Sequence, residues 1–258
     1  MNLEKFYLDV VSADGSGCIG YATRLGAGLM LAPAALLMWH AESDAPARQM
    51  RTLRGALPRL EDGIWSWDCP ALAVSGNWQL GDAPEPVREN LWQSAEGGVL
   101  WENLAPRARV TLRVGRNEIV GSGYLERLRL TIPPWQLPIH GLRWGRFATA
   151  DMSIVWICWE HDEPRRWLWV DGQHREPRRI TEQIVEWSGG RLVFETHRRL
   201  RHGRLGETVF ARWPQARRLL PSRVRAYEET KWCSQATLSR DARSDVTGWA
   251  IHEFVRFQ

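Results

Sequence analysis

Apolar and polar side chains alternate along much of this chain with the two-residue period of a β-strand. Residues 109–114 show this most clearly, because the even positions are valine, leucine and valine and the odd positions are arginine or threonine. Gly115-Arg-Asn117 then provides a turn, and the alternation resumes in 118–132. Repetition of this arrangement, with few long apolar helical patterns, predicts an all-β protein built from antiparallel meanders.

The strongest break in the pattern is the Pro-rich segment 133–138. We place a boundary there between an N-terminal β domain, residues 1–135, and a C-terminal β domain, residues 136–258. Meanders with one apolar face close into barrels because closure removes exposed edges. Strands are expected at 5–11, 18–24, 29–39 (one strand or a pair), 65–68, 71–78, 109–114 and 118–132, and a hairpin broken at Gly97-Gly98 is expected over 91–102. Further strands are expected at 154–159, 167–170, 180–187, 192–196, 209–213, 223–228, 235–240 and 249–257.

A single carboxylate interrupts the apolar row of the strand at 118–132. Positions 124, 126, 128, 130 and 132 share one face, and Glu126 is the charged member. Burial of a charge is costly unless the charge is paired or neutralised. Either Arg143 or Arg146 pairs with Glu126 and keeps the carboxylate ionised, or the pKa of the Glu126 carboxyl group rises and Glu126 can act as a general acid. Glu253 lies in a similar apolar row near the C-terminus.

The segment around Glu126 also resembles a known family. Gly121-x-Gly-Tyr124-x-Glu126, followed some twenty residues later by Trp144-Gly-Arg146, resembles the carotenoid 1,2-hydratase (hydroxyneurosporene synthase) and AttH-like group, which is related in fold to tocopherol cyclase. The resemblance covers about residues 100–146. It implies two lipocalin-like (calycin-type) antiparallel barrels, and a Tyr124 and Glu126 pair that protonates an isoprenoid double bond. Glu126 stands where the family has Asp, and Val99 stands at the place of a family histidine.

The 16 tryptophans exceed what a core of this size needs, and they suggest flat aromatic walls around an apolar cavity. Aromatic faces stabilise a carbocation by the same attraction that binds ammonium ions. Each tryptophan taken alone is more often a packing residue. The expected substrate-binding residues are Trp101, Trp135, Trp144, Arg146 and Glu253, beside the expected catalytic pair Glu126 and Tyr124.

These features predict a cofactor-independent hydratase or cyclase. The substrate would be an apolar unsaturated small molecule, isoprenoid or polyketide-like, and Glu126 would protonate a double bond or activate a carbonyl. Two alternatives stay open. A lipocalin-like carrier would bind an apolar ligand without chemistry, and a pericyclic cyclase would act only by holding its substrate folded.

Several other classes lack support in the sequence. The net charge is +4, and arginines are dense between 165 and 225, but glutamates are interleaved with them, so no nucleic-acid partner is expected. The seven histidines are scattered, and no metal site is expected. The apolar run 25–41 contains Gly26, Gly28 and Pro33, which favours buried strands over membrane insertion. No secretory signal is recognisable, and the four distant cysteines suggest thiols in a reducing compartment, so we expect a cytoplasmic protein.

Overall fold

The computed structural model describes residues 2–26, 32–204, 224, 226–241 and 243–257. In this part of the chain, strands make up nearly all of the regular structure, which confirms the predicted all-β class. The chain divides into two compact units. Unit 1 is Met1–Pro133 with Ala150–Met152, and unit 2 is Pro134–Thr149 with Ser153–Gln258. The division between Pro133 and Pro134 falls inside the Pro-rich segment.

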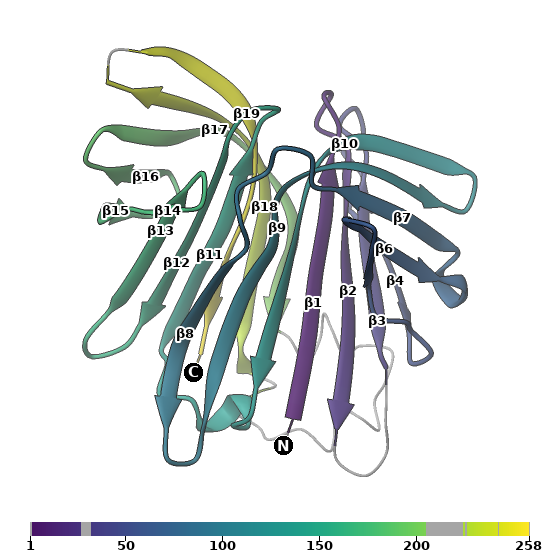
Figure 1. The fold of residues 1–258 in the computed structure, drawn as a ribbon, viewed down its shortest axis with the longest axis horizontal. Helices are drawn as coiled ribbons and strands as arrows, with labels where there is room; N and C mark the ends of the chain where they lie inside the picture. Colours follow the sequence, from purple (N-terminus) through teal and green to yellow (C-terminus); the bar gives the residue numbers. More distant parts are fainter. Residues whose placement is uncertain (1, 27–31, 205–223, 225, 242, 258) are drawn as a thin grey trace. The chain divides into compact units, whose positions relative to one another are not determined.

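Unit 1 is a curled antiparallel half-barrel sheet (Figure 1). The strand order is β4-β3-β2-β1-β10-β9-β7-β6-β5, and β8 pairs with the first part of β9. Its elements are β1 (Asn2–Val11), β2 (Gly17–Gly26), β3 (Ala34–Trp39), β4 (Arg48–Thr52), β5 (Arg59–Glu61), β6 (Ile64–Cys69), the 3-10 helix η1 (Pro70–Leu72), β7 (Val74–Gln79), β8 (Val87–Ser94), β9 (Gly97–Val114) and β10 (Asn117–Leu130).

Unit 2 is a second curled antiparallel sheet, with the order β14-β13-β12-β11-β19-β18-β17-β16-β15. Its elements are the 3-10 helix η2 (Pro134–Gln136), β11 (Gly141–Ala148), β12 (Ser153–Glu160), β13 (Arg165–Val170), β14 (Gln173–His174), β15 (Pro177–Ile180), β16 (Ile184–Trp187), β17 (Gly190–Arg204), β18 (Glu228–Arg240) and β19 (Arg243–Arg256).

The two units share one topology. In each, the first four strands form a meander that runs outward from the first strand, and the last strand pairs with the first strand on its other side. The pairs are β1 with β10 and β11 with β19, joined for example at Leu3↔Leu130 and Gly141↔Arg256. Tyr124-x-Glu126 on β10 and Ile251-x-Glu253 on β19 therefore occupy corresponding strands.

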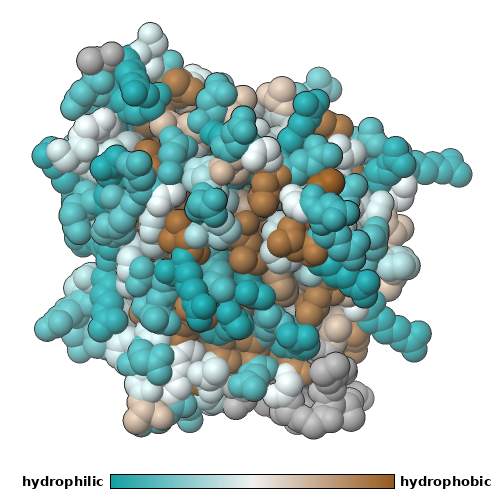
Figure 2. Space-filling model, in the orientation of Figure 1, coloured by the Kyte–Doolittle hydropathy of each residue, from teal (hydrophilic) through white to brown (hydrophobic). Residues whose placement is uncertain are grey.

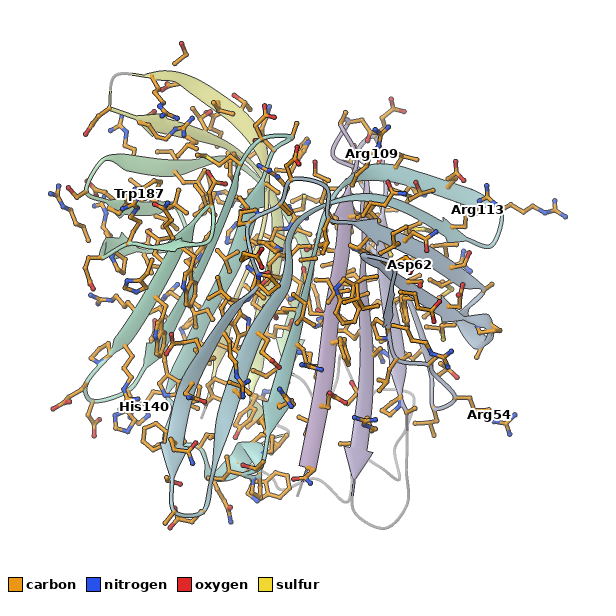
Figure 3. All side chains as sticks on the ribbon, in the orientation of Figure 1. Arg54, Asp62, Arg109, Arg113, His140 and Trp187 are labelled. Carbon is orange, nitrogen blue, oxygen red and sulfur yellow. The ribbon has the colours of Figure 1, made fainter. Side chains whose placement is uncertain are left out.

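One face of the unit 1 sheet carries its apolar core, a cluster that includes Leu8, Val10 and Leu125. The even positions 110, 112 and 114 belong to this core, as their alternation predicts, while Arg113 is on the other face and pairs with Glu118 at 2.7 Å near the β9–β10 hairpin (Figure 3). The alternation at 109–114 therefore reports correctly which face of this part of β9 is buried.

The strands expected at 5–11 and 18–24 pair as the antiparallel hairpin β1–β2, whose turn contains Asp14-Gly15. Gly15 has a φ of 88°, and the Asp14 carboxylate accepts hydrogen bonds from the Ser16 backbone N–H at 3.0 Å and from the Ser16 hydroxyl at 2.9 Å.

Two strands predicted near the C-terminus are not confirmed. The strand expected at 209–213 lies outside the described residues. The strand expected at 223–228 is wrong at Val224 and Ala226, which are helical, and β18 begins only at Glu228.

Close strand contacts explain the Gly-x-Gly of the family-like motif. A Cβ on Gly121 would lie 2.1 Å from the Val11 backbone oxygen, and one on Gly123 would lie 2.3 Å from the Asp9 backbone oxygen. The same approach lets the Trp78 indole N–H donate to that Asp9 oxygen at 2.9 Å. Glycine at both positions lets β10 lie close against β1.

Gly123→Ala is therefore expected to destabilise the fold by about 1–3 kcal/mol, the usual cost of overpacking. The added methyl group would meet backbone on one side and Val110 at 2.4 Å on the other. Urea unfolding measures the change. Gly26→Ala is the matched control, since its Cβ would meet nothing closer than 3.7 Å; an equal loss in both variants would contradict the explanation.

Hydrophilic side chains cover much of the face drawn in Figure 2, with hydrophobic groups between them. Among the described residues, the large exposed hydrophobic side chains are those of Leu53, Leu60 and Val120, which come from different strands and loops. No helix in the described part of the chain is long and apolar enough to cross a membrane.

Candidate active site

The carboxylate of Glu126 receives two hydrogen bonds on one oxygen. The Trp101 indole Nε1–H donates to Glu126 Oε2 at 2.5 Å, and the Tyr124 hydroxyl donates to the same oxygen at 2.8 Å. Trp101 and Tyr124 are buried and Glu126 is half-buried. Three of the residues expected at the site from the sequence therefore meet within unit 1.

Two irregularities in the β9–β10 pairing lie beside Glu126. The register shifts between Gly123 and Leu125 and again between Leu125 and Glu126, so β9 carries extra residues there. Bulges of this kind re-aim side chains and are common next to functional sites. Here they bring Asn103 directly opposite Glu126, and Trp101 opposite Leu128, the next residue of the same face.

Strand β1 adds residues that the sequence analysis missed. Tyr7 is directly opposite Glu126, and Asp9 is directly opposite Tyr124, so all four side chains share one face. The Tyr7 ring contacts the ring of Tyr124 at 6.1 Å. Asp9 is 1% exposed. The signal was present in the sequence, because Asp9 is an acid among apolar residues of its strand, as Glu126 is.

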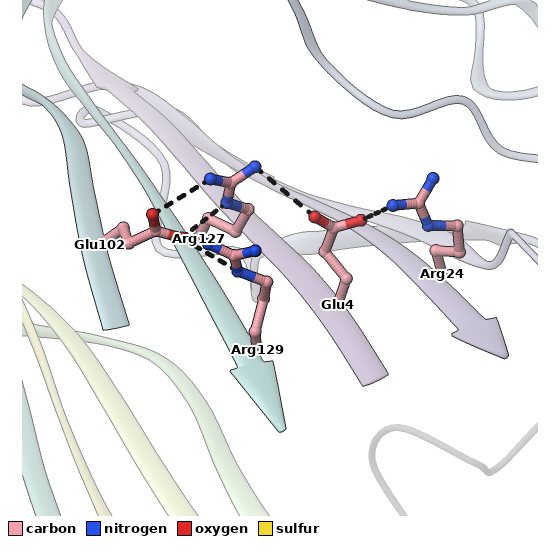
Figure 4. Close-up of polar contacts among 5 residues, drawn as sticks. All are labelled: Glu4, Arg24, Glu102, Arg127 and Arg129. Carbon is pink, nitrogen blue, oxygen red and sulfur yellow. Dashed lines mark hydrogen bonds and ion pairs between the residues drawn. The ribbon is translucent and has the colours of Figure 1, made fainter. Parts of the chain in front are cut away.

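The arginines on the opposite face of β10 have a different partner. Arg127 and Arg129 both donate to Glu102, at 2.8 and 2.9 Å, and Arg127 also reaches Glu4, which Arg24 binds in turn (Figure 4). Burial acts to raise the pKa of Glu102, but hydrogen bonds and charge from Arg127 and Arg129 outweigh it and hold that pKa below its usual range. This network ties β1, β2, β9 and β10 together on that face.

Two arginines were considered as ionic partners of Glu126. Arg143 is held by Glu160 at 2.8 Å and Glu182 at 3.2 Å, and its guanidinium lies 4.0 Å from the Phe254 ring centre. Arg146 is 1% exposed and donates to the Trp249 backbone oxygen at 3.1 Å. Each thus has contacts of its own within unit 2.

The second acid expected from the sequence, Glu253, has a contrasting environment. The Lys231 ammonium, itself 1% exposed, pairs with Glu253 and lies 3.6 Å from Glu229. Lys231 also lies 5.7 Å from the ring centre of Trp144, which is directly opposite Glu253 on β11. On corresponding strands, one glutamate is bound by an indole and a phenol and the other by an ammonium ion.

The remaining expected residue is Trp135, which is half-buried in η2. A role in substrate binding stays a prediction for Trp135, Trp144, Arg146 and Glu253. Among the described residues, no group of three or more histidine, cysteine or acidic side chains could hold a metal ion.

The fold can be compared with solved structures. An AttH candidate from Nitrosomonas europaea, NE1406, matches 98% of this chain and 92% of its own length, with a TM-score of 0.56 and 12% identity. CghA, in a structure with Sch210972, matches 100% and 89%, with a TM-score of 0.56 and 10% identity. Kievitone hydratase from Nectria haematococca matches 98% and 88%, with a TM-score of 0.53 and 9% identity.

The chain has the fold of these proteins. The AttH-like, two-part β fold implied by the sequence motif is therefore confirmed as a fold. No protein-family model matches the sequence, and no curated protein matches it either. At these identities the AttH-like fold is what the likeness establishes, and the chemistry has to be argued from the side chains of this chain.

Within this AttH-like fold, unit 2 also holds a second polar cluster, around His252. The Ser234 hydroxyl lies 2.9 Å from His252 Nε2 and 3.0 Å from His197 Nδ1. The His252 ring stacks on Phe194 and Trp232 with centroid distances of 4.5 and 5.1 Å. Burial, with smaller contributions from the charges of His197 and Lys231, lowers the pKa of His252 from 6.5 to about 3. His252 is therefore a neutral core histidine.

This lowered pKa predicts a pH dependence of stability. Below about pH 6.5 the unfolded chain takes up a proton at residue 252 that the folded chain does not bind until about pH 3. His252 therefore reduces stability as the pH falls through that window and has no such effect above it. Urea unfolding at pH 7 and pH 4.5 should show a smaller difference for His252→Phe than for the wild type. The exposed control His174→Gln should keep the full difference; a His252→Phe profile equal to the wild type would contradict this account.

Proposed function

We propose that the protein is a cofactor-independent hydratase or cyclase in which the carboxyl group of Glu126 protonates an apolar, unsaturated small molecule. The observation that carries the proposal is the pair of hydrogen bonds from Trp101 and Tyr124 to a single oxygen of Glu126. An indole nitrogen can only donate, so Oε2 is held as an acceptor and a proton on this carboxyl group occupies Oε1. The two hydrogen bonds thus assign the proton of this acid to one of its two oxygens.

The neighbours of Glu126 suit the cation that such a protonation creates. Tyr7, Tyr124 and Trp101 bring aromatic rings to the same part of the sheet, and aromatic faces stabilise cations. Capture of the cation by water gives hydration, and capture by an internal alkene or nucleophile gives cyclisation. An isoprenoid or polyketide-like substrate offers the double bonds that both outcomes need. The fold shared with kievitone hydratase is consistent with a hydratase.

The first test needs no substrate. Infrared spectra of the wild type and of Glu126→Gln at neutral pH should differ by the C=O stretch of one protonated carboxyl group. Absence of that band in the wild type would show that Glu126 is ionised at rest and would remove the acid from the proposal. A panel containing kievitone and neurosporene, incubated in D₂O and followed by mass spectrometry, then tests for deuterium uptake, hydration and cyclisation.

We also infer that the enzyme works in the cytoplasm. Its four cysteines, Cys18, Cys69, Cys158 and Cys233, are buried thiols, and burial raises the pKa of Cys18 and Cys158. Thiols of this kind are typical of a reducing compartment. Fractionation of the native host with an antibody to the protein tests the inference.

A further inference from the structure

Asn103 holds a polar atom with no hydrogen-bond partner. It lies on β9, is 1% exposed, and its Oδ1 accepts no hydrogen bond from the residues that the structure describes. Most buried polar atoms in folded proteins are hydrogen-bonded, so an acceptor in this state requires a reason. The reason can be a ligand that supplies the missing donor.

The position of Asn103 indicates where that donor would be. Asn103 and Glu126 are directly opposed on β9 and β10, so their side chains share a face and their Cβ atoms lie about 4.5–5.5 Å apart. On its other side Asn103 pairs with Val87 of β8, whose side chain has no donor to offer. A water molecule or a substrate hydroxyl beside Glu126 could donate to Oδ1.

We propose that Asn103 is a catalytic residue that accepts a hydrogen bond from the water molecule adding to the substrate. The proposal rests on the proposed function of Glu126, and it selects hydration over cyclisation. Glu126 gives its proton to one alkene carbon, and the water oxygen bonds to the cation formed at the other carbon. The water then loses a proton to the Glu126 carboxylate, which restores the acid, while its remaining O–H stays bonded to Asn103 Oδ1. The sum is alkene plus water giving an alcohol.

Asn103→Leu tests this role, because leucine is close to asparagine in size and has no acceptor. Reaction with kievitone and neurosporene in D₂O separates the two steps: deuterium in recovered or isomerised alkene reports protonation, and the alcohol reports water capture. We expect the ratio of alcohol to deuterated alkene to fall about tenfold or more, since the water loses its positioning contact. Asn77→Leu, the same change at an exposed position of β7, should leave both unchanged.

Thermal unfolding distinguishes this role from a merely structural one, because replacement of a side chain that only supports the fold would lower the Tm. Removal of an unsatisfied buried acceptor is neutral or stabilising, so Asn103→Leu should keep or raise the wild-type Tm. A Tm several degrees lower, or equal losses of deuterium uptake and alcohol, would overturn the proposal.

A crystal structure of the wild type decides the case without turnover. A water or ligand hydroxyl within hydrogen-bond distance of Oδ1 supports the proposal, and a protein donor or a dry contact there overturns it. Failure of the proposed function looks different. In that case wild type and Glu126→Gln take up deuterium equally or not at all, while the crystal structure still reports on Asn103.

Discussion

Glu126→Gln is expected to lower both deuterium uptake and product formation by about 10²–10⁴-fold, the usual contribution of a positioned general acid. The amide oxygen of glutamine can still accept the hydrogen bonds of Trp101 and Tyr124, which now bind Oε2 at 2.5 and 2.8 Å. The amide has no acidic proton to give. The fold should therefore survive, and circular dichroism and the Tm should match the wild type.

The control for this variant lies on the same strand. Glu118→Gln removes an exposed carboxylate of β10 that pairs with Arg113, and it should leave turnover unchanged. Full turnover by Glu126→Gln would end the acid mechanism. A carrier or a cyclase that acts only by holding its substrate folded would then be the better description.

The largest loss of stability is expected for Lys231→Met, at about 3–5 kcal/mol. The Lys231 ammonium is buried between Glu253, with which it pairs, and Glu229 at 3.6 Å. Its removal leaves the Glu253 carboxylate, whose side chain is only 15% exposed, without its cation, and a partly buried charge without a partner is poorly solvated. Urea unfolding of the wild type and the variant measures the loss.

Two further variants separate charge from packing. Lys231→Met combined with Glu253→Gln removes both charges of the pair and should recover much of the stability. Arg113→Met breaks an ion pair whose side chains are 70% and 44% exposed, and it should change stability by less than about 1 kcal/mol. If the double variant were as unstable as Lys231→Met alone, an uncompensated charge would not be the cause.

The sequence predicted the faces of strands better than their partners. Alternation is a local property, so positions 110, 112 and 114 could be assigned to the core and Glu126 to an apolar row from the residues alone. The acid and its phenol also lie two residues apart on one strand, which fixes their common face. Trp101 was linked to them only by nearness in the sequence and by the family-like motif.

The missing parts of the site depend on pairing between distant strands. Tyr7 and Asn103 meet Glu126 through the β1–β10 and β9–β10 registers, and the β9 bulges shift the second of these. No local pattern encodes a bulge or a long-range register. The contrast between Glu126 and Glu253 was hidden for the same reason, because Lys231 reaches Glu253 from a neighbouring strand. The common topology of the two units likewise left no repeat in the sequence.

The pairing of first with last strands has a consequence for biosynthesis. Residues 3–11 can pair with β10 only after residues 122–130 have left the ribosome. Residues 141–148 likewise can pair with β19 only after residues 249–256 have been made. Contacts between such distant segments make folding slow, and an unpaired strand edge invites aggregation while it waits. The nascent chain should therefore depend on chaperones, and its yield should improve when translation is slowed or the temperature is lowered.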